Sequence, residues 1–281
     1  MSGTVFASLL FAALMSATWN AIVKGGPNKY LHAVLVANSA ALIAVIFLPF
    51  LQQPAPQAWL CIGASAVLQV VYYGFLAAAF RAGDMSHAYP LMRGTAPLLV
   101  SLASGPLIGE SLSLGRWVGV VMICTGVMAL AWEMRRYRAS ANSAVVKYGL
   151  LNAVVIAAYT VIDGFGVRRS GTAVSYTLWN LLLTALILSI WTMLTRCKEF
   201  FDYAEGRLPV ALIGGLATVM SYGIVLWAMT QAPIAAVAAL RETSMIFVLA
   251  IAVVVFKERA GPRRYAATVL IAGGAVAIRL W

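Results

Sequence analysis

The sequence predicts an all-α membrane protein with ten transmembrane helices, arranged as two inverted five-helix repeats. Three observations predict this class: an apolar composition, ten long apolar segments and an internal sequence repeat. Of the 281 residues, 62% are hydrophobic and only 10% are charged, whereas soluble domains carry about 25% charged residues. The mean hydropathy is +0.89. A chain of this length cannot bury so much apolar side chain in one soluble globule, so we expect lipid to solvate much of its surface.

Each predicted helix is a run of roughly twenty apolar residues, the length that crosses about 30 Å of hydrocarbon. The ten segments lie at 3–23, 31–51, 57–80, 85–108, 113–132, 145–165, 173–195, 209–230, 234–256 and 262–280. Glycine, proline and asparagine mark the short connections, as expected for turns. The first segment lacks a basic start and is too long for a secretory signal, so we expect a retained helix.

An internal repeat divides the chain. The recurring pairs are Tyr73 and Tyr222, Arg93 and Arg241, Glu110 and Glu258, and Asn38 and Asn180. They predict a first repeat at 1–132, a linker at 133–144 and a second repeat at 145–281. Because five is odd, the second repeat enters the membrane in the opposite sense. Inverted repeats place a central site at their interface, near the bilayer midplane, which predicts transport of a small molecule.

The net charge of +11 is concentrated in short clusters between apolar segments. The connections after the first, third, fifth, seventh and ninth segments hold 14 Lys and Arg residues. The opposite side holds four: Arg116, Arg168, Arg169 and Arg279. The positive-inside rule then predicts a multi-pass protein of the bacterial inner membrane with both termini periplasmic. No basic face with interleaved aromatic residues is present, which excludes nucleic acid as a partner.

Two arginines inside apolar segments are the leading candidates for substrate binding. A charge near the bilayer centre costs at least about 2.5–3.5 kcal/mol, so Arg93 and Arg241 need a reason to be there. As repeat mates they should face one cavity from opposite sides, and the planar guanidinium suits a carboxylate or phosphate. The alternative is that they pair internally, for example with Glu242, and only hold helices together. Glu242 itself could bind a substrate amine, carry a coupling proton or neutralise Arg93.

The 85–108 segment contains further candidates. Tyr89 lies four residues before Arg93 and shares its helix face. His87 begins the segment and is a candidate for proton coupling, although a plain interfacial histidine has the same position. Asp163 and Glu242 are the other coupling candidates. Three helix-interrupting residues, Pro90, Gly94 and Pro97, predict a break or kink, which serves either gating or packing.

Aromatic and amide side chains complete the predicted pocket: Trp19, Asn20, Asn38, Tyr73, Tyr159, Asn180 and Tyr222. Aromatic rings can stack on an organic cation, but Trp and Tyr are also ordinary membrane-interface residues.

Gly115, Gly119 and the Gly273-Gly274 pair predict close helix contacts. Cys61, Cys124 and Cys197 show no metal or redox spacing. We therefore expect no metal, no cofactor and no enzyme activity.

The halves end in similar turns, Ile108-Gly109-Glu110-Ser111-Leu112-Ser113-Leu114 and Phe256-Lys257-Glu258-Arg259-Ala260-Gly261-Pro262. With ten helices in two five-helix repeats, this Glu-bearing turn resembles the EamA-type members of the drug/metabolite transporter superfamily. The stretches Tyr89 to Pro97 and Tyr159 to Gly164 are similar to a branch associated with phosphonate utilisation. The resemblance implies a secondary transporter that works by alternating access, in many members an exporter of amino acids or other metabolites.

The combined prediction is a secondary active transporter, with export favoured, for a small anionic or zwitterionic metabolite such as an amino acid or aminoalkylphosphonate. Two alternatives remain open. The protein could export organic cations or drugs, with Glu242 or Asp163 as the cation site, or it could be a non-transporting scaffold or a lipid flippase. The expected partners are the small-molecule substrate and the lipid bilayer, and the expected assembly is a monomer or homodimer.

Overall fold

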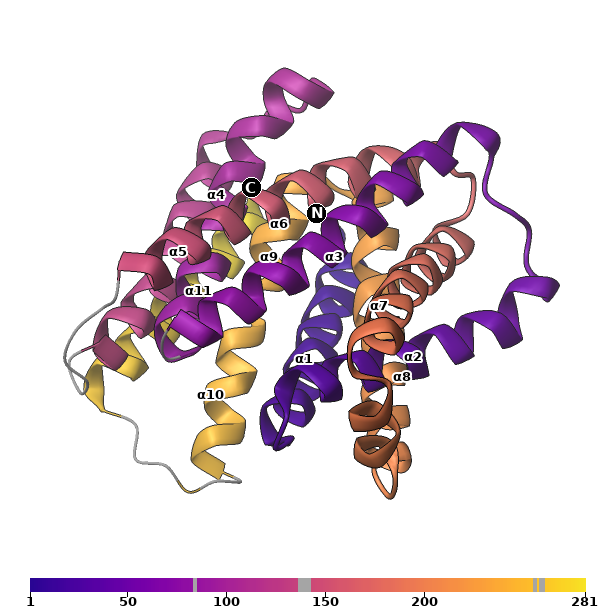
Figure 1. The fold of residues 1–281 in the computed structure, drawn as a ribbon. Coiled ribbons are helices and arrows are strands. Elements are labelled where there is room, and N and C mark those ends of the chain that lie inside the picture. The colour runs from indigo at the N-terminus through magenta and orange to yellow at the C-terminus, as the bar shows by residue number, and fades with distance from the viewer. Residues whose placement is uncertain (83–84, 136–142, 255–256, 258–260) are drawn as a thin grey trace.

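In a computed structural model, the chain forms a bundle of helices (Figure 1). The structure describes residues 1–82, 85–135, 143–254, 257 and 261–281, with the side chains of all of these except 80–82, 85–90, 131–135 and 252. Every element in these ranges is helical: α1 (Gly3–Gly25), α2 (Lys29–Phe47), η1 (Leu48–Phe50), η2 (Pro56–Ala58), α3 (Trp59–Ala82), α4 (Met85–Ile108), α5 (Leu114–Arg135), α6 (Ser143–Arg169), α7 (Ala173–Ala204), α8 (Leu208–Gln231), α9 (Ile234–Arg241), α10 (Ser244–Val254) and α11 (Pro262–Leu280).

The protein is an all-α, multi-pass membrane protein, as predicted. Within the described residues, eight helical stretches are long and apolar enough to cross a bilayer. In α5 the qualifying apolar stretch is shorter, Leu114–Leu130, and α11 carries arginines at both ends, which narrow its apolar stretch. Large apolar side chains face outward, with Leu60 85% exposed and Leu194 80% exposed. Such exposure suits contact with lipid.

Polar side chains at several helix starts satisfy backbone N–H groups that have no partner within the helix. The Ser2 hydroxyl accepts a hydrogen bond from the Val5 N–H, and the Asn28 side chain accepts one from the Leu31 N–H. The Thr172 hydroxyl does the same for Ser175 at the start of α7. These caps define the residues at which α1, α2 and α7 begin.

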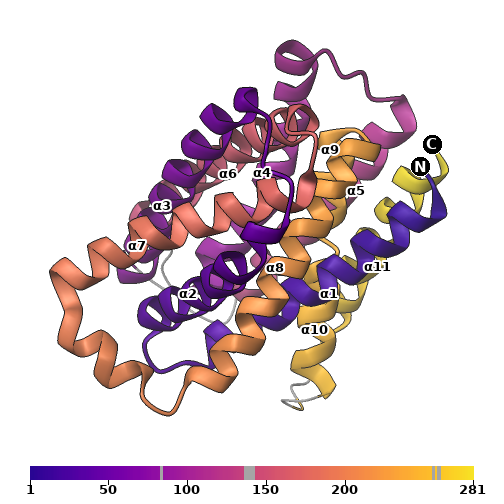
Figure 2. The same cartoon turned by 90° about the vertical axis from the view of Figure 1, so that its right-hand side faces the viewer.

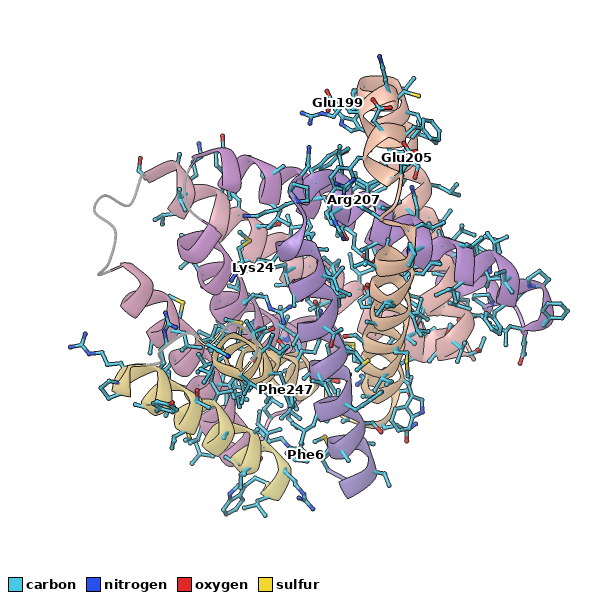
Figure 3. The ribbon with its side chains drawn as sticks, turned by 90° about the horizontal axis from the view of Figure 1, so that it is seen from below. Phe6, Lys24, Glu199, Glu205, Arg207 and Phe247 are labelled. Carbon is cyan, nitrogen blue, oxygen red and sulfur yellow. The ribbon has the colours of Figure 1, made fainter. Side chains whose placement is uncertain are left out.

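Helices of the two halves pack against one another in matching pairs. α1 packs on α8 as α3 packs on α6, while α2 lies against α7, α4 against α9 and α5 against α11. The chain ends lie beside each other (Figure 2). Phe6 of α1 lies next to α11 (Figure 3), where the Arg279 guanidinium stands 5.2 Å from its ring centroid.

The structure differs from two of the predicted segments, 234–256 and 173–195. The 234–256 segment is two helices, α9 and α10, separated at Glu242 and Thr243. The N–H groups of these two residues bond to the carbonyls of Ala239 and Leu240, three residues back, so the turn tightens and the α-helix stops. The predicted connection 196–208 also contains helix. α7 continues to Ala204 beyond a kink at Arg196.

The predicted break in the 85–108 segment does not occur. α4 is one continuous helix, Met85–Ile108, through Gly94 and Pro97. A Cβ on Gly94 would lie 2.9 Å from the Met128 side chain, so this glycine allows α4 to approach α5 closely. The break therefore occurs in α9 and α10, the sequence counterpart of α4, and not in α4 itself.

Candidate functional site

A small internal cavity of about 90 Å³ lies where the two halves meet. Its walls come from eight helices of both halves. They comprise Ser16, Trp19, Ala33, Val36, Ala37, Gln69, Tyr72, Tyr73, Arg93, Ile156, Tyr159, Leu181, Thr184, Thr218, Ser221, Tyr222 and Arg241. Aromatic rings and hydroxyl groups dominate this lining. Among the described lining residues, only Arg93 and Arg241 carry a formal charge.

Arg93 bridges the break between α9 and α10. Its Nε lies 2.8 Å from Glu242 Oε2, and its Nη2 donates a hydrogen bond of 3.0 Å to the Ser244 hydroxyl. Arg93 is 8% exposed and Glu242 only 4%. Because Glu242 follows the last residue of α9 and Ser244 is the first residue of α10, one guanidinium from α4 holds both sides of the break. The ion pair also neutralises much of the Arg93 charge.

Arg241 is the lining arginine that can still pair with an acid group. In the described part of the chain it forms no ion pair with a carboxylate. It ends the short helix α9, whose residues from Ile234 to Leu240 are all buried, and the Tyr159 hydroxyl lies close enough to bond with it. A helix that is apolar on every side is held firmly in the core. The Arg241 side chain therefore projects into the cavity from a fixed support.

Asp163 of α6 sits behind the cavity wall in a network of polar side chains. Its Oδ1 accepts hydrogen bonds from the Tyr176 hydroxyl at 2.9 Å and the Asn180 amide at 3.2 Å, and its Oδ2 accepts one from the Tyr222 hydroxyl. Gln69 Nε2 lies 2.6 Å from Asn180 Oδ1 and 3.0 Å from the Tyr222 oxygen. Because Tyr222 and Gln69 also line the cavity, one hydroxyl group separates the Asp163 carboxylate from it.

The structure brings six of the predicted site residues to the cavity wall: Trp19, Tyr73, Arg93, Tyr159, Tyr222 and Arg241. Three more, Asp163, Asn180 and Glu242, are buried directly behind it and bond to lining residues. The six lining residues come from six different helices, α1, α3, α4, α6, α8 and α9.

The remaining predicted residues lie elsewhere. Asn20 lines a second, smaller cavity. Asn38 is outside the lining, and its Oδ1 accepts a hydrogen bond from the Ser189 hydroxyl, so it differs from its sequence counterpart Asn180. The side chains of Tyr89 and His87 lie outside the described residues.

The second cavity, of about 50 Å³, adjoins the first. The two share Trp19, Ala33, Tyr72 and Tyr73. From there the second cavity extends to Lys24 and Lys29, where α1 ends and α2 begins. Figure 3 labels Lys24 at this end of α1.

At the other end of α1 the bundle is tied by Glu110 and Arg168. Arg168 Nη2 lies 2.6 Å from Glu110 Oε1, and Arg168 also donates to the carbonyls of Met229 and Ala232 at the end of α8. The Glu110 carboxylate accepts from the N–H of Ile234, the first residue of α9. Glu110 thus caps α9 while Arg168 caps α8. The sequence singled out Glu110 but gave no partner for it.

Thr184 and Ser221 are lining residues that the sequence reasoning missed. A signal for Thr184 was present, because it lies four residues after Asn180 and therefore on the same face of α7. Hydroxyl side chains are common in membrane helices, so type alone does not distinguish Thr184 from other threonines of α7.

The chain matches the EamA-like transporter family over residues 2–132 and 144–280. A curated relative, the uncharacterized protein y4nH of Sinorhizobium fredii, is 33% identical over 66 residues, which are 22% of this chain and 56% of that protein. The match thus spans little more than half of the relative's length. A solved crystal structure superposes with a TM-score of 0.79 at 20% identity, covering 100% of this chain and 98% of the other. That likeness establishes a shared fold.

Proposed function

Because the chain belongs to the EamA-like transporter family, we propose that it is a secondary active transporter of a small anionic or zwitterionic metabolite, such as an amino acid or an aminoalkylphosphonate. The observation that carries the proposal is Arg241, a cation on the cavity wall without an ion-pair partner in the described part of the chain. Arg93 is already paired with Glu242. An incoming acid group would supply the charge that Arg241 lacks.

The size and lining of the cavity favour a compact ligand. Cavities for drug-sized molecules have volumes of about 300–1,000 Å³, whereas this one has about 90 Å³. Tyr72 packs edge-to-face on Tyr73 and on Tyr159, with ring centroids 5.2 and 6.4 Å apart. Such rings can receive the ammonium of a zwitterion by cation–π attraction. These features support a metabolite over a bulky organic cation.

The proposed mechanism is alternating access between the two halves, with export as the favoured direction. Two features at opposite ends of α1 support it. The second cavity leads from the site to Lys24, on the lysine-rich side that we assign to the cytoplasm. The Glu110–Arg168 pair ties α8 and α9 at the other end. Opening that end requires this pair to separate.

The proposal is tested by thermal-shift measurements on the purified protein in detergent. The ligands are amino acids, phosphonates, phosphate esters and quaternary amines. A ligand that binds only the folded state raises the melting temperature by mass action. We expect an acid or zwitterion to stabilise the wild type, and Arg241→Gln to raise its Kd at least about tenfold, because a hydrogen-bonded charge is lost.

The matched control is Arg279→Gln, which removes an exposed arginine at the end of α11 and should leave the Kd unchanged. Arg93→Gln is unsuitable as the main test because it leaves the Glu242 carboxylate buried without its partner, which destabilises the fold. Stabilisation by quaternary amines alone, unchanged in Arg241→Gln, would refute the acid site and support a cation exporter.

A further inference from the structure

One buried hydroxyl, on a residue that lines the cavity, has no partner among the described residues. Thr184 of α7 is 4% exposed, and its Oγ1 has no hydrogen-bond partner in the part of the chain that the structure describes. The threonine and serine hydroxyls that line the cavity from α8 are bonded. Thr218 donates to the Gly214 carbonyl at 2.8 Å, and Ser221 donates to the Ala12 carbonyl at 2.9 Å.

The missing bond is unusual for a threonine in a helix. Such hydroxyls commonly donate to the carbonyl four residues back, and α7 shows this at Thr177, bonded to Ala173, and at Thr192, bonded to Leu188. Burying a hydroxyl without a partner is unfavourable, because its hydrogen bonds to water are lost and not replaced. Thr184 therefore carries a stability cost that a ligand in the cavity would remove.

We propose that the Thr184 hydroxyl binds substrate, and that it takes a second polar group of an acid whose acid group is held by Arg241. The two residues line the same cavity from different helices, α7 and α9. The Thr184 hydroxyl oxygen is itself buried in the wall, so it would reach a ligand by rotation of the side chain about its Cα–Cβ bond, and the two residues could then hold two ends of one compact molecule. The hydroxyl oxygen accepts a hydrogen bond from an ammonium or a hydroxyl group. The inference rests on the proposed acid site and narrows its ligand to acids with a second hydrogen-bonding group.

The test pairs a change in the protein with a change in the ligand. Affinities are measured for two pairs of ligands, β-alanine and propionate, and 2-aminoethylphosphonate and ethylphosphonate. The second member of each pair lacks the amine. The proteins compared are wild type, Thr184→Val and Thr177→Val. Valine keeps the shape of threonine and removes the hydroxyl. Thr177 is a buried threonine of the same helix that lies outside the cavity lining, and its hydroxyl donates to the Ala173 carbonyl.

We expect wild type to prefer the amine-bearing member of a pair, and Thr184→Val to reduce that preference about tenfold, in line with a hydrogen bond to a charged group. Thr177→Val should keep the preference. An unchanged preference in Thr184→Val, with acid binding that still depends on Arg241, would overturn this inference alone. If no acid binds the wild type, the proposed function fails and this assignment fails with it.

A second measurement needs no ligand. The melting temperature of ligand-free Thr184→Val should equal or exceed that of wild type, because a hydroxyl without a partner is removed. Thr192→Val, which removes a bonded hydroxyl from the same helix, should melt lower. Clear destabilisation by Thr184→Val would show that its hydroxyl has a structural partner and would overturn the proposal.

Discussion

The Asp163 carboxylate is surrounded by donors and is 1% exposed. Hydroxyls of Tyr176 and Tyr222 and the amide of Asn180 all donate to it, and Arg241 lies near enough to contribute to its electrostatic environment. Because Tyr222 also faces the cavity, a proton taken up by Asp163 would release a residue that shapes the substrate site. We therefore favour Asp163 over Glu242, which is paired with Arg93, as the coupling residue.

Asp163→Asn tests this role. The amide has nearly the same shape, so substrate binding should remain within about threefold of wild type while hydroxyl groups reorient around it. Uptake of the acid into proteoliposomes should lose its dependence on an imposed pH gradient, because the variant cannot carry the proton. Glu205→Gln, at an exposed carboxylate, is the control. A pH dependence that survives in Asp163→Asn would limit Asp163 to a structural role.

Arg93 and Arg241 stood out in the sequence because a charged side chain is costly inside a membrane, and both line the cavity. Thr184 did not stand out, because a threonine in a helix becomes unusual only when its neighbours are known. Lys257 is a second residue whose conformation the sequence did not reveal. It adopts a left-handed backbone with φ of 52°, as its repeat counterpart Gly109 does with φ of 76°, although lysine and glycine differ in type.

At the scale of helices, α5 and α11 meet at a crossing of glycines. A Cβ on Gly119 would lie 2.7 Å from the Gly274 carbonyl oxygen, and one on Gly274 would lie 2.6 Å from the Gly119 oxygen. Two backbones in such contact gain van der Waals packing that larger residues prevent. The predicted small-residue contact sites therefore meet each other.

Gly119→Ala should destabilise the protein by about 1–3 kcal/mol through overpacking, seen as a lower melting temperature in detergent. Gly63→Ala is the matched control, because a Cβ there meets nothing within 4 Å and a helical alanine is favoured over glycine. If both variants melted at the wild-type temperature, the close crossing of α5 and α11 would be contradicted.

Helix existence was predictable because each span is a long apolar run, but helix interruptions were not. Pro97 and Gly94 predicted a break in α4 that the packing against α5 accommodates as continuous helix. The break between α9 and α10 has no proline or glycine. It coincides with contacts from elsewhere, namely Arg93 to Glu242 and Ser244, and such tertiary contacts cannot be read from local sequence.

At the scale of the whole molecule, both halves contribute residues to the cavity wall, and few of the described charged side chains lie on or behind that wall. Arg93 is paired with Glu242, and Asp163 lies behind the wall among hydroxyl and amide donors. Arg241 is therefore the charged group on the wall that forms no ion pair among the described residues. The internal repeat predicts a central site with two equivalent arginines. The structure shows that they differ: Arg93 contacts Glu242 and Ser244, whereas Arg241 forms no ion pair among the described residues.

Charge-selective labelling at Thr218 tests the central claim without knowledge of the substrate. Thr218→Cys is made in a protein with Cys61, Cys124 and Cys197 replaced by alanine. Its reaction rates with a sulfonate-bearing and a trimethylammonium-bearing methanethiosulfonate are each divided by the rate with a free thiol. We expect the sulfonate to react at least about fivefold faster, because a positive cavity concentrates anions, and adding Arg241→Gln should remove this preference. A faster reaction with the ammonium reagent, or a preference unaffected by Arg241→Gln, would contradict the account.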